Sequence, residues 1–157
     1  MYRALDLSKY IVAKCVDDGE PISNLQLQKI LYYIQESFLK RGERAFSDAI
    51  EVWRFEPAVP DVYYRYCGFG ANTIDFSCEK FAVKEQDKAE IDKIIESKRI
   101  LEPWTLVAEV HKENGAWAQT YQNGAGDRAK IPVELIASKS RQLKFFKKRR
   151  NILREAY

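Results

Sequence analysis

Residues 23–42 constrain the fold more than any other stretch of the chain. Apolar side chains recur there at positions i, i+3, i+4, i+7 and i+11 (Leu27, Ile30, Leu31, Ile34 and Phe38), the spacing that places them on one side of an α-helix. Tyr32 and Tyr33 widen this apolar stripe. Because so broad an apolar surface has to be covered by other elements, we expect a central buried helix around which the rest of the chain packs.

Residues at both ends of this stretch favour helix boundaries. Ser23 and Gln26 have the spacing of a capping box, in which each side chain accepts a hydrogen bond from the backbone N–H of the other residue. Pro21 disfavours helix before this point, and Gly42 can take the left-handed conformation that closes a last helical turn. The sequence therefore predicts a helix that starts after Ser23 and stops before Gly42.

The composition indicates a soluble globular protein. The chain has 157 residues, of which 46% are hydrophobic and 31% charged, enough for one well-filled core. No window approaches the roughly 18 uninterrupted apolar residues of a membrane span, and the N-terminus lacks the features of a signal peptide. Cys15, Cys67 and Cys78 lack C-x-x-C spacing, so we expect them to be reduced and packed. We infer a cytoplasmic protein that does not enter a membrane.

The remaining segments predict a mainly α-helical fold with a small β element, an α+β class. Helical spacing recurs in residues 4–16, 60–66, 85–99, 103–111, 132–137 and from about 141 onward. Residues 46–55 favour a short strand, and residues 73–83 favour either a second short strand or an irregular segment. We expect these elements to form a compact helical domain around the central helix.

Charge divides the chain into a body, residues 1–137, and a basic C-terminal helix, residues 138–157, which either belongs to the same domain or extends it. From Ser138 onward there are eight Lys and Arg residues and one acidic residue, Glu155, so this segment has a formal charge of +7. The whole chain has a formal net charge of +3. The body is then acidic, at −4. Such a polarity suits either an anionic partner or attraction between the two parts.

No arrangement of residues in the sequence supports catalysis or a metal site. His111 is the only histidine, and no second His or Cys stands at ligand spacing beside it. Glu109 and Glu113 share its helix side but have no acid or base partner. A phosphate-binding loop and a G-x-S-x-G nucleophile motif are both missing. We expect a protein that is not an enzyme and holds no cofactor, with His111 partly buried and hydrogen-bonded to a neighbour.

Aromatic residues are dense between positions 53 and 121. We expect Trp53 and Trp104 to lie in the core. Tyr63 and Tyr64 are adjacent on one predicted helix and cannot both point inward, so part of the aromatic set faces solvent, where Tyr and Trp commonly anchor protein interfaces. The sequence thus favours a protein-binding surface that contains some of these side chains.

Three interpretations of the basic C-terminal helix stay open. Phe145 and Ile152, like Phe146 and Leu153, are seven residues apart and form an apolar side that can dock on the body. Alternatively, the cluster Lys147, Lys148, Arg149 and Arg150 binds nucleic-acid phosphates or an acidic partner protein. No helix-turn-helix supports sequence-specific DNA recognition.

Three blocks of sequence resemble the Panacea antitoxin domain, a SocA-like, phage-associated family. They are residues 25–35 (LQLQKILYYIQ), residues 50–53 (IEVW) leading into residues 57–66 (PAVPDVYYRY), and His111 with Trp117. Glu56 departs from the family pattern, which tends to have Gly there, and Ala58 intervenes before Val59. The turn after Trp53 is therefore expected to differ from that of other members.

The resemblance implies a mainly helical fold and a role in a toxin–antitoxin pair, in which the antitoxin binds and neutralises a partner toxin. We expect the partner-binding residues to be Trp53, Tyr63, Tyr66, His111 and Trp117. Two other hypotheses remain: a nucleic-acid-binding regulator that uses the basic C-terminal helix, and an adaptor that delivers its partner to a protease. The sequence predicts neither the identity of the toxin nor the oligomeric state.

Overall fold

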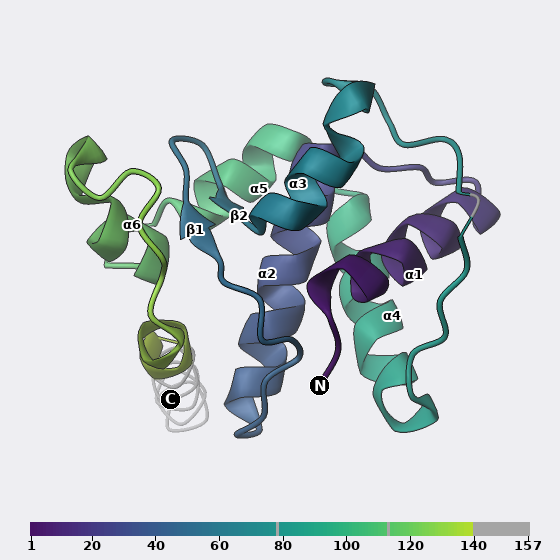
Figure 1. Ribbon diagram of the computed structural model, residues 1–157, viewed down its shortest axis with the longest axis horizontal. Helices are drawn as coiled ribbons and strands as arrows, with labels where there is room; N and C mark the ends of the chain where they lie inside the picture. The colour runs from purple at the N-terminus through teal and green to yellow at the C-terminus, as the bar shows by residue number, and fades with distance from the viewer. Residues whose placement is uncertain (78, 113, 140–157) are drawn as a thin grey trace, which may run out of the picture.

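The computed structural model describes residues 1–77, 79–112 and 114–139 (Figure 1). Within these ranges the elements are α1 (Ala4–Asp17), α2 (Asn24–Lys40), β1 (Glu51–Val52), β2 (Pro57–Ala58), α3 (Pro60–Tyr66), η1 (Cys67–Phe69), α4 (Glu85–Arg99), α5 (Pro103–Val110), α6 (Ala116–Tyr121) and η2 (Gln122–Gly124). Residues 133–139 are also helical. The fold is mainly α-helical with a small β element, as predicted. No helix in the described ranges is long and apolar enough to cross a membrane.

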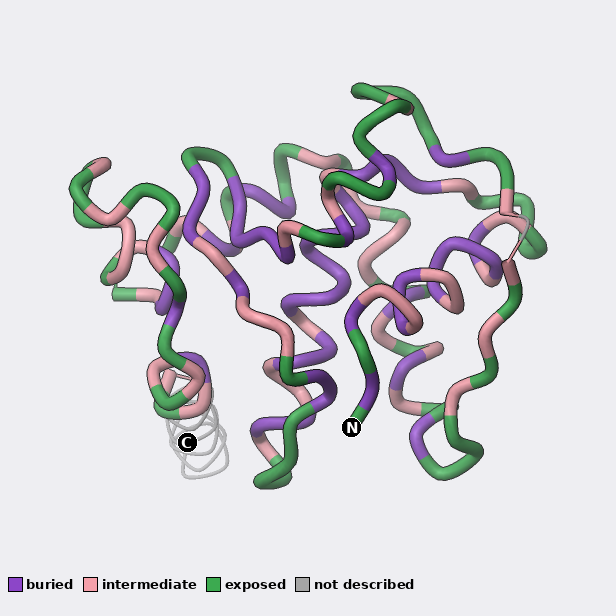
Figure 2. Tube along the Cα trace, in the orientation of Figure 1, coloured by how far each residue is buried: buried purple, intermediate pink, exposed green. Residues whose placement is uncertain are grey.

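Helix α2 is the centre of the fold, which confirms the prediction from its apolar stripe. Figure 1 shows it in the middle of the molecule, and it packs against α1, α3, α4, α5 and β2. Leu27, Ile30, Leu31 and Ile34 have no exposed surface, and Figure 2 shows buried residues along most of this helix. The predicted capping box is present: the Ser23 hydroxyl accepts from the Gln26 N–H, and the Gln26 side chain accepts from the Ser23 N–H.

Helix α2 also carries buried polar side chains on its remaining faces. The Gln35 amide donates to the Phe46 carbonyl (3.0 Å) and accepts from the Ala45 N–H (2.8 Å). The Gln26 amide donates to the carbonyls of Arg99 and Leu101 at the end of α4. Because these contacts satisfy backbone groups of loops, α2 positions the connections around it as well as the hydrophobic core.

The β element is a two-residue antiparallel hairpin, in which Glu51 pairs with Ala58 and Val52 with Pro57. An isolated bridge joins Glu51 to Lys130 on its other side. The strand predicted within residues 46–55 is therefore present but short. Of the two alternatives for residues 73–83, the structure supports the irregular segment: in its described part, only Thr73 forms a bridge, with Ser23. The side chains of Asp75 and Phe76 are exposed, so this segment would bury little apolar surface by pairing with another strand.

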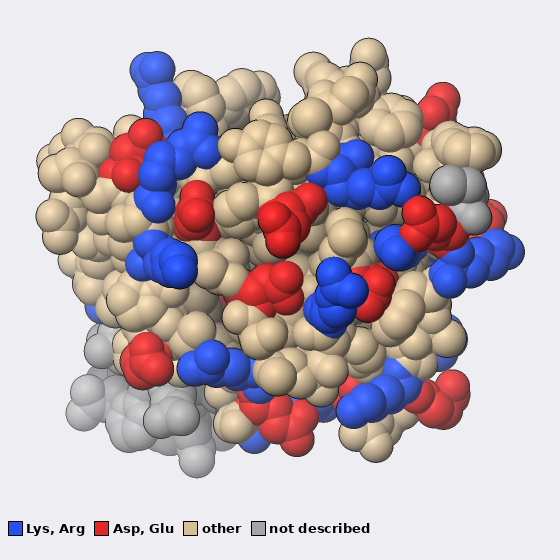
Figure 3. Space-filling model, in the orientation of Figure 1, with Lys and Arg blue, Asp and Glu red and all other residues tan. Residues whose placement is uncertain are grey.

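A polar network connects α4 to α2 and to the N-terminus. Arg41 forms ion pairs with Asp87 (2.7 Å) and Glu90 (2.9 Å), and the Tyr2 hydroxyl donates to Asp87 (2.6 Å). On the face shown in Figure 3, acidic and basic side chains are interspersed rather than segregated. The predicted basic C-terminal helix from residue 141 onward lies outside the described residues.

Candidate functional site

The turn between β1 and β2, residues 53–56, is the point where the three family-like blocks of sequence meet. Two hydrogen bonds between the backbones of Trp53 and Glu56 close it, at 2.9 and 3.2 Å. The buried Lys29 of α2 donates from Nζ to the Phe55 carbonyl at 3.0 Å. Gln28, its neighbour, accepts from the Val59 N–H at 2.9 Å. The polar residues of the LQLQK block therefore position the turn and the strand that follows it.

Side chains from α5 and α6 hold the turn from another direction. The Nε2 atom of His111 lies 3.1 Å from the Phe55 carbonyl oxygen, and the Trp117 Nε1–H donates to the Trp53 carbonyl at 3.0 Å. A carbonyl oxygen only accepts, so the His111 proton that points to it sits on Nε2. The two rings stack, with centroids 3.7 Å apart and planes 13° apart. The predicted hydrogen bond of a partly buried His111 is thus present, and its acceptor is the turn itself.

Aromatic contacts extend from the turn on both sides. Tyr121 stacks on Trp117 at 4.5 Å, and Tyr63 packs edge-on against Trp53 at 4.6 Å. The Arg128 guanidinium lies 3.8 Å above the Trp53 ring. Arg128 has a positive φ of 66°. This backbone conformation is unfavourable for a residue other than glycine and persists where surrounding contacts impose it.

Burial perturbs the titration of three groups beneath the turn. Burial lowers the pKa of Lys29 to about 7, and the nearby Glu56 carboxylate reduces the size of this shift. Burial likewise raises the pKa of Glu56 to about 7, and the Lys29 charge reduces that shift. Burial, and then the Lys29 charge, lower the pKa of His111. Glu56 is 7% exposed, and its Oε2 atom has no hydrogen-bond partner among the described residues. The turn therefore rests on a buried acid and a buried base that depend on each other.

The tip of the turn projects two large aromatic side chains into solvent. Phe55 is 48% exposed and packs edge-on against Trp104, which is 67% exposed, with centroids 6.0 Å apart. The expectation that Trp104 lies in the core is wrong. On α5 the buried residues are Leu106, Val107 and Val110, whereas Trp104 and Ala108 share the exposed side. Trp53 does lie in the core, as predicted.

The predicted partner-binding residues differ in how far their side chains are buried. Trp53, Tyr66 and Trp117 are 8%, 8% and 6% exposed, whereas Tyr63 and His111 are partly exposed. The structure brings Trp53, Tyr63, His111 and Trp117 together around the turn. Direct contact of these residues with a partner stays a prediction.

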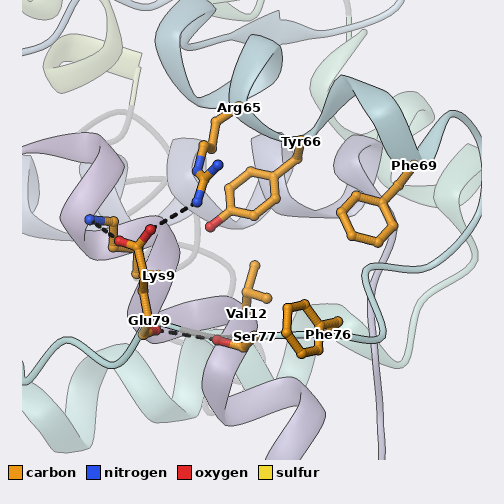
Figure 4. A pocket seen from close by; sticks show the side chains of 8 residues that line it. All are labelled: Lys9, Val12, Arg65, Tyr66, Phe69, Phe76, Ser77 and Glu79. Atoms are coloured by element: carbon orange, nitrogen blue, oxygen red, sulfur yellow. Dashed lines mark hydrogen bonds and ion pairs between the residues drawn. The ribbon is translucent and has the colours of Figure 1, made fainter.

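Tyr66 lies apart from the turn, in the wall of a pocket of about 180 Å³ between α1, α3 and the residues Phe76, Ser77 and Glu79 (Figure 4). Val12, Phe69 and Phe76 give this pocket an apolar side. Glu79 closes the other side through ion pairs with Lys9 (2.5 Å) and Arg65 (2.9 Å). Because its charged groups pair with one another, the pocket offers mainly apolar contact.

The other residues singled out from the sequence lie away from the turn or outside the residues that the structure describes. Lys147, Lys148, Arg149, Arg150, Cys78 and Glu113 fall outside the described residues. Cys15 is buried as expected, but Cys67 is exposed, because it belongs to the short 3-10 segment that follows α3. Glu109 accepts from Tyr33 (2.6 Å) and Lys98 (2.8 Å). In the part of the chain that the structure describes, His, Cys, Asp and Glu side chains form no group of three able to hold a metal.

The sequence interpretation missed the roles of Gln28, Lys29, Glu56 and Arg128. A signal existed for the first two, because polar residues that interrupt a broad apolar helix are candidates for buried hydrogen bonds. Nothing local to Arg128 indicates that its side chain reaches Trp53, 75 positions away in the sequence, a contact that only the tertiary fold creates.

The chain matches the family described as "Antitoxin SocA-like, Panacea domain" over residues 27–118, which include most of α2, the hairpin, α5 and Trp117. It is also similar to Antitoxin SocA of Caulobacter vibrioides (strain NA1000 / CB15N), with 30% identity over 119 residues. That alignment covers 68% of this chain and 63% of the relative, so it leaves more than a third of the relative unmatched. No solved structure matches the chain. The matched region contains Lys29, His111 and Trp117, which hold the turn. Since the family match covers more than half of the chain, the chain belongs to the family described as SocA-like antitoxins with a Panacea domain.

Proposed function

We propose that this protein is an antitoxin that neutralises a partner toxin by direct binding and catalyses no reaction, acting in the cytoplasm. Membership of the family supports the antitoxin role. The observation that supports direct binding is the 53–56 turn, which exposes Phe55 beside Trp104 while the side chains of Lys29 on α2, His111 after α5 and Trp117 on α6 hold its backbone. Large aromatic side chains on a rigid support are the usual anchors of protein interfaces.

Rigidity of the turn is what makes it suited to binding. Four hydrogen bonds from side chains or backbone reach the carbonyls of Trp53 and Phe55, so the backbone loses little freedom when a partner docks. A surface that needs no ordering keeps more of its contact free energy as affinity. Neutralisation by binding requires no catalytic group.

The experiment starts from the genes beside the one that encodes this chain. Each neighbour is expressed from an inducible promoter in a bacterial host, with and without this protein. The proposal expects one neighbour to arrest growth alone, to be tolerated when this protein is present, and to co-purify with it at a fixed ratio. If every neighbour is harmless, or if protection occurs without any complex, the proposal of direct neutralisation is wrong.

Nucleic-acid binding through Lys147–Arg150 stays a separate prediction, based on the charge of residues 138–157. Affinity for duplex DNA should fall steeply with salt concentration and should be lost in a chain that ends at residue 137. DNA affinity that persists in the shortened chain would exclude this role for the C-terminal segment.

A further inference from the structure

The surface around the 53–56 turn combines exposed aromatic rings with arginines stacked on aromatic rings. Arg54 lies 5.0 Å from the centre of the Phe55 ring, and Arg128 lies 3.8 Å above Trp53. Phe55 contacts Trp104, and Trp53 contacts Tyr64, which is 61% exposed. The five side chains Arg54, Phe55, Tyr64, Trp104 and Arg128 are all solvent-exposed, and the turn connects them into one surface, here called the arginine–aromatic surface.

The two arginines have no carboxylate partner within ion-pair distance among the described residues. A guanidinium that stacks through its flat face keeps its N–H edge available, and that edge matches the two oxygens of a carboxylate. The left-handed backbone at Arg128 adds to this, because a strained residue whose side chain serves no internal ion pair is a candidate for recognition.

We propose that the arginine–aromatic surface is where this protein binds its toxin, and that the toxin presents carboxylates around an apolar cleft that receives Phe55 and Trp104. This inference rests on the proposed function for the identity of the partner, but the chemistry of the surface is independent of it. Arg54 and Arg128 pair with the carboxylates, and the two exposed rings supply the apolar contact.

The neighbouring charges distinguish a protein partner from a nucleic acid. Four acidic residues, Glu51, Asp61, Glu102 and Asp127, lie within three positions of the surface in the sequence, and all but Glu51 are exposed. Two exposed basic residues lie equally near, Lys130 and Arg65, of which Arg65 pairs with Glu79. The Glu51 carboxylate accepts from the Trp53 indole at 3.0 Å. A continuous polyanion laid over this surface would meet these carboxylates, whereas separate carboxylates of a folded partner can each meet one arginine. The surface therefore fits a protein with discrete acidic residues.

The first arm of the test uses the growth-arresting neighbour protein identified above. Charge reversal in the double variant Arg54→Glu/Arg128→Glu should weaken its binding at least tenfold, and the pair Phe55→Ala/Trp104→Ala at least a hundredfold. Lys93→Glu, an exposed site on α4, is the control for charge, and Phe76→Ala is the control for loss of an exposed ring. Circular dichroism checks that all variants fold. Unchanged affinity in both double variants would overturn the proposal.

The second arm needs no toxin. The probe is a synthetic peptide with alternating acidic and large apolar residues, compared with the same peptide carrying Lys for every acidic residue and with a short single-stranded oligothymidylate. Side-chain NMR signals of the Arg54 and Arg128 guanidinium groups and the Trp104 indole are followed. The proposal expects shifts with the acidic peptide alone, reduced by salt and lost in Arg54→Glu/Arg128→Glu. Equal shifts with the basic peptide, shifts with the oligothymidylate instead, or no shifts would overturn it.

The two arms separate failure of this inference from failure of the proposed function. If no neighbour is toxic but the acidic peptide binds as described, the antitoxin role is wrong and the surface chemistry stands. If a toxin is neutralised and binds both double variants as tightly as the original protein, the antitoxin role stands and the surface lies elsewhere.

Discussion

Lys29 and His111 donate to the same atom, the carbonyl oxygen of Phe55, from 3.0 and 3.1 Å. Lys29 belongs to the central helix and His111 follows α5, so the oxygen binds two side chains that are 82 positions apart in the sequence. Lys29 is fully buried and His111 partly buried, whereas the Phe55 ring is 48% exposed. Lys29 and His111 therefore hold the backbone of the turn in place, apart from the exposed side chains that we propose contact the partner.

Replacing Lys29 should destabilise the protein more than replacing it together with Glu56. In Lys29→Met the buried Glu56 loses its opposite charge and the Phe55 carbonyl loses a donor, which we expect to cost about 3 kcal/mol in the free energy of unfolding. In Lys29→Met/Glu56→Gln no buried charge remains, and the cost should shrink to about 1 kcal/mol. Urea unfolding at neutral pH measures both. A double variant less stable than Lys29→Met would contradict this account of the pair.

The Glu56 carboxyl should make stability fall as pH rises from about 4.5 to about 7. Its pKa in the folded protein, about 7, is above the ordinary value of 4.5, so the folded state binds more protons than the unfolded state in that range, and raising the pH favours unfolding. Glu56→Gln should remove this slope, a difference of about 2 kcal/mol between the two proteins across the range. Parallel pH profiles of unfolding free energy for both proteins would show that Glu56 titrates normally.

Two carboxylates that form ion pairs with Arg41, those of Asp87 and Glu43, should differ sharply in what they contribute to the free energy of unfolding. Asp87 is buried and also accepts from Tyr2, so Asp87→Asn should cost about 3 kcal/mol. Glu43 lies 3.1 Å from the same guanidinium but is 61% exposed, and Glu43→Gln should cost less than about 0.5 kcal/mol. Thermal and urea unfolding compare the pair directly. Similar losses for both would mean that burial of Asp87 adds nothing to the interaction.

Gly126 should not tolerate a side chain, whereas Gly68 should. A Cβ atom at position 126 would lie 1.8 Å from the Thr120 carbonyl oxygen, so the backbone after α6 has to shift and carry Arg128 away from Trp53. We expect Gly126→Ala to cost about 2 kcal/mol or more and to shift the NMR signal of the Trp53 indole. Gly68 has no atom within 4 Å of the same position, and Gly68→Ala serves as the control. An unchanged indole signal in Gly126→Ala would show that the loop adapts without moving Arg128.

Local spacing was sufficient to predict α1 to α5, whereas the six-residue helix α6 was not predicted. The apolar positions of α2, its capping box and its end at Gly42 all follow from contacts within one or two helical turns, and the structure confirms each of them. The same holds for α4, whose bounds match the predicted residues 85–99. Trp104 was misplaced because tryptophan as a residue type favours burial, whereas its position on α5, on the side it shares with Ala108 and away from Leu106 and Val110, decides its exposure.

The candidate site was predictable only in part. Trp53, Tyr63, His111 and Trp117 were identified from their residue types and from the family resemblance, and they do lie around one turn. Their relation to Lys29 and Glu56 depends on three-dimensional contacts between α2 and the hairpin, which no local pattern encodes. The exposure of Phe55 likewise follows from the path of a turn that tertiary hydrogen bonds impose.

The separation between the tip of the turn and its buried supports has a consequence for how such a protein diversifies. Arg54 and Phe55 stand in solvent, so substitutions there should leave the free energy of unfolding nearly unchanged. If the turn binds the toxin as we propose, related chains that keep the buried supports can change the toxin they recognise by substituting a few exposed residues, without first having to gain stability elsewhere.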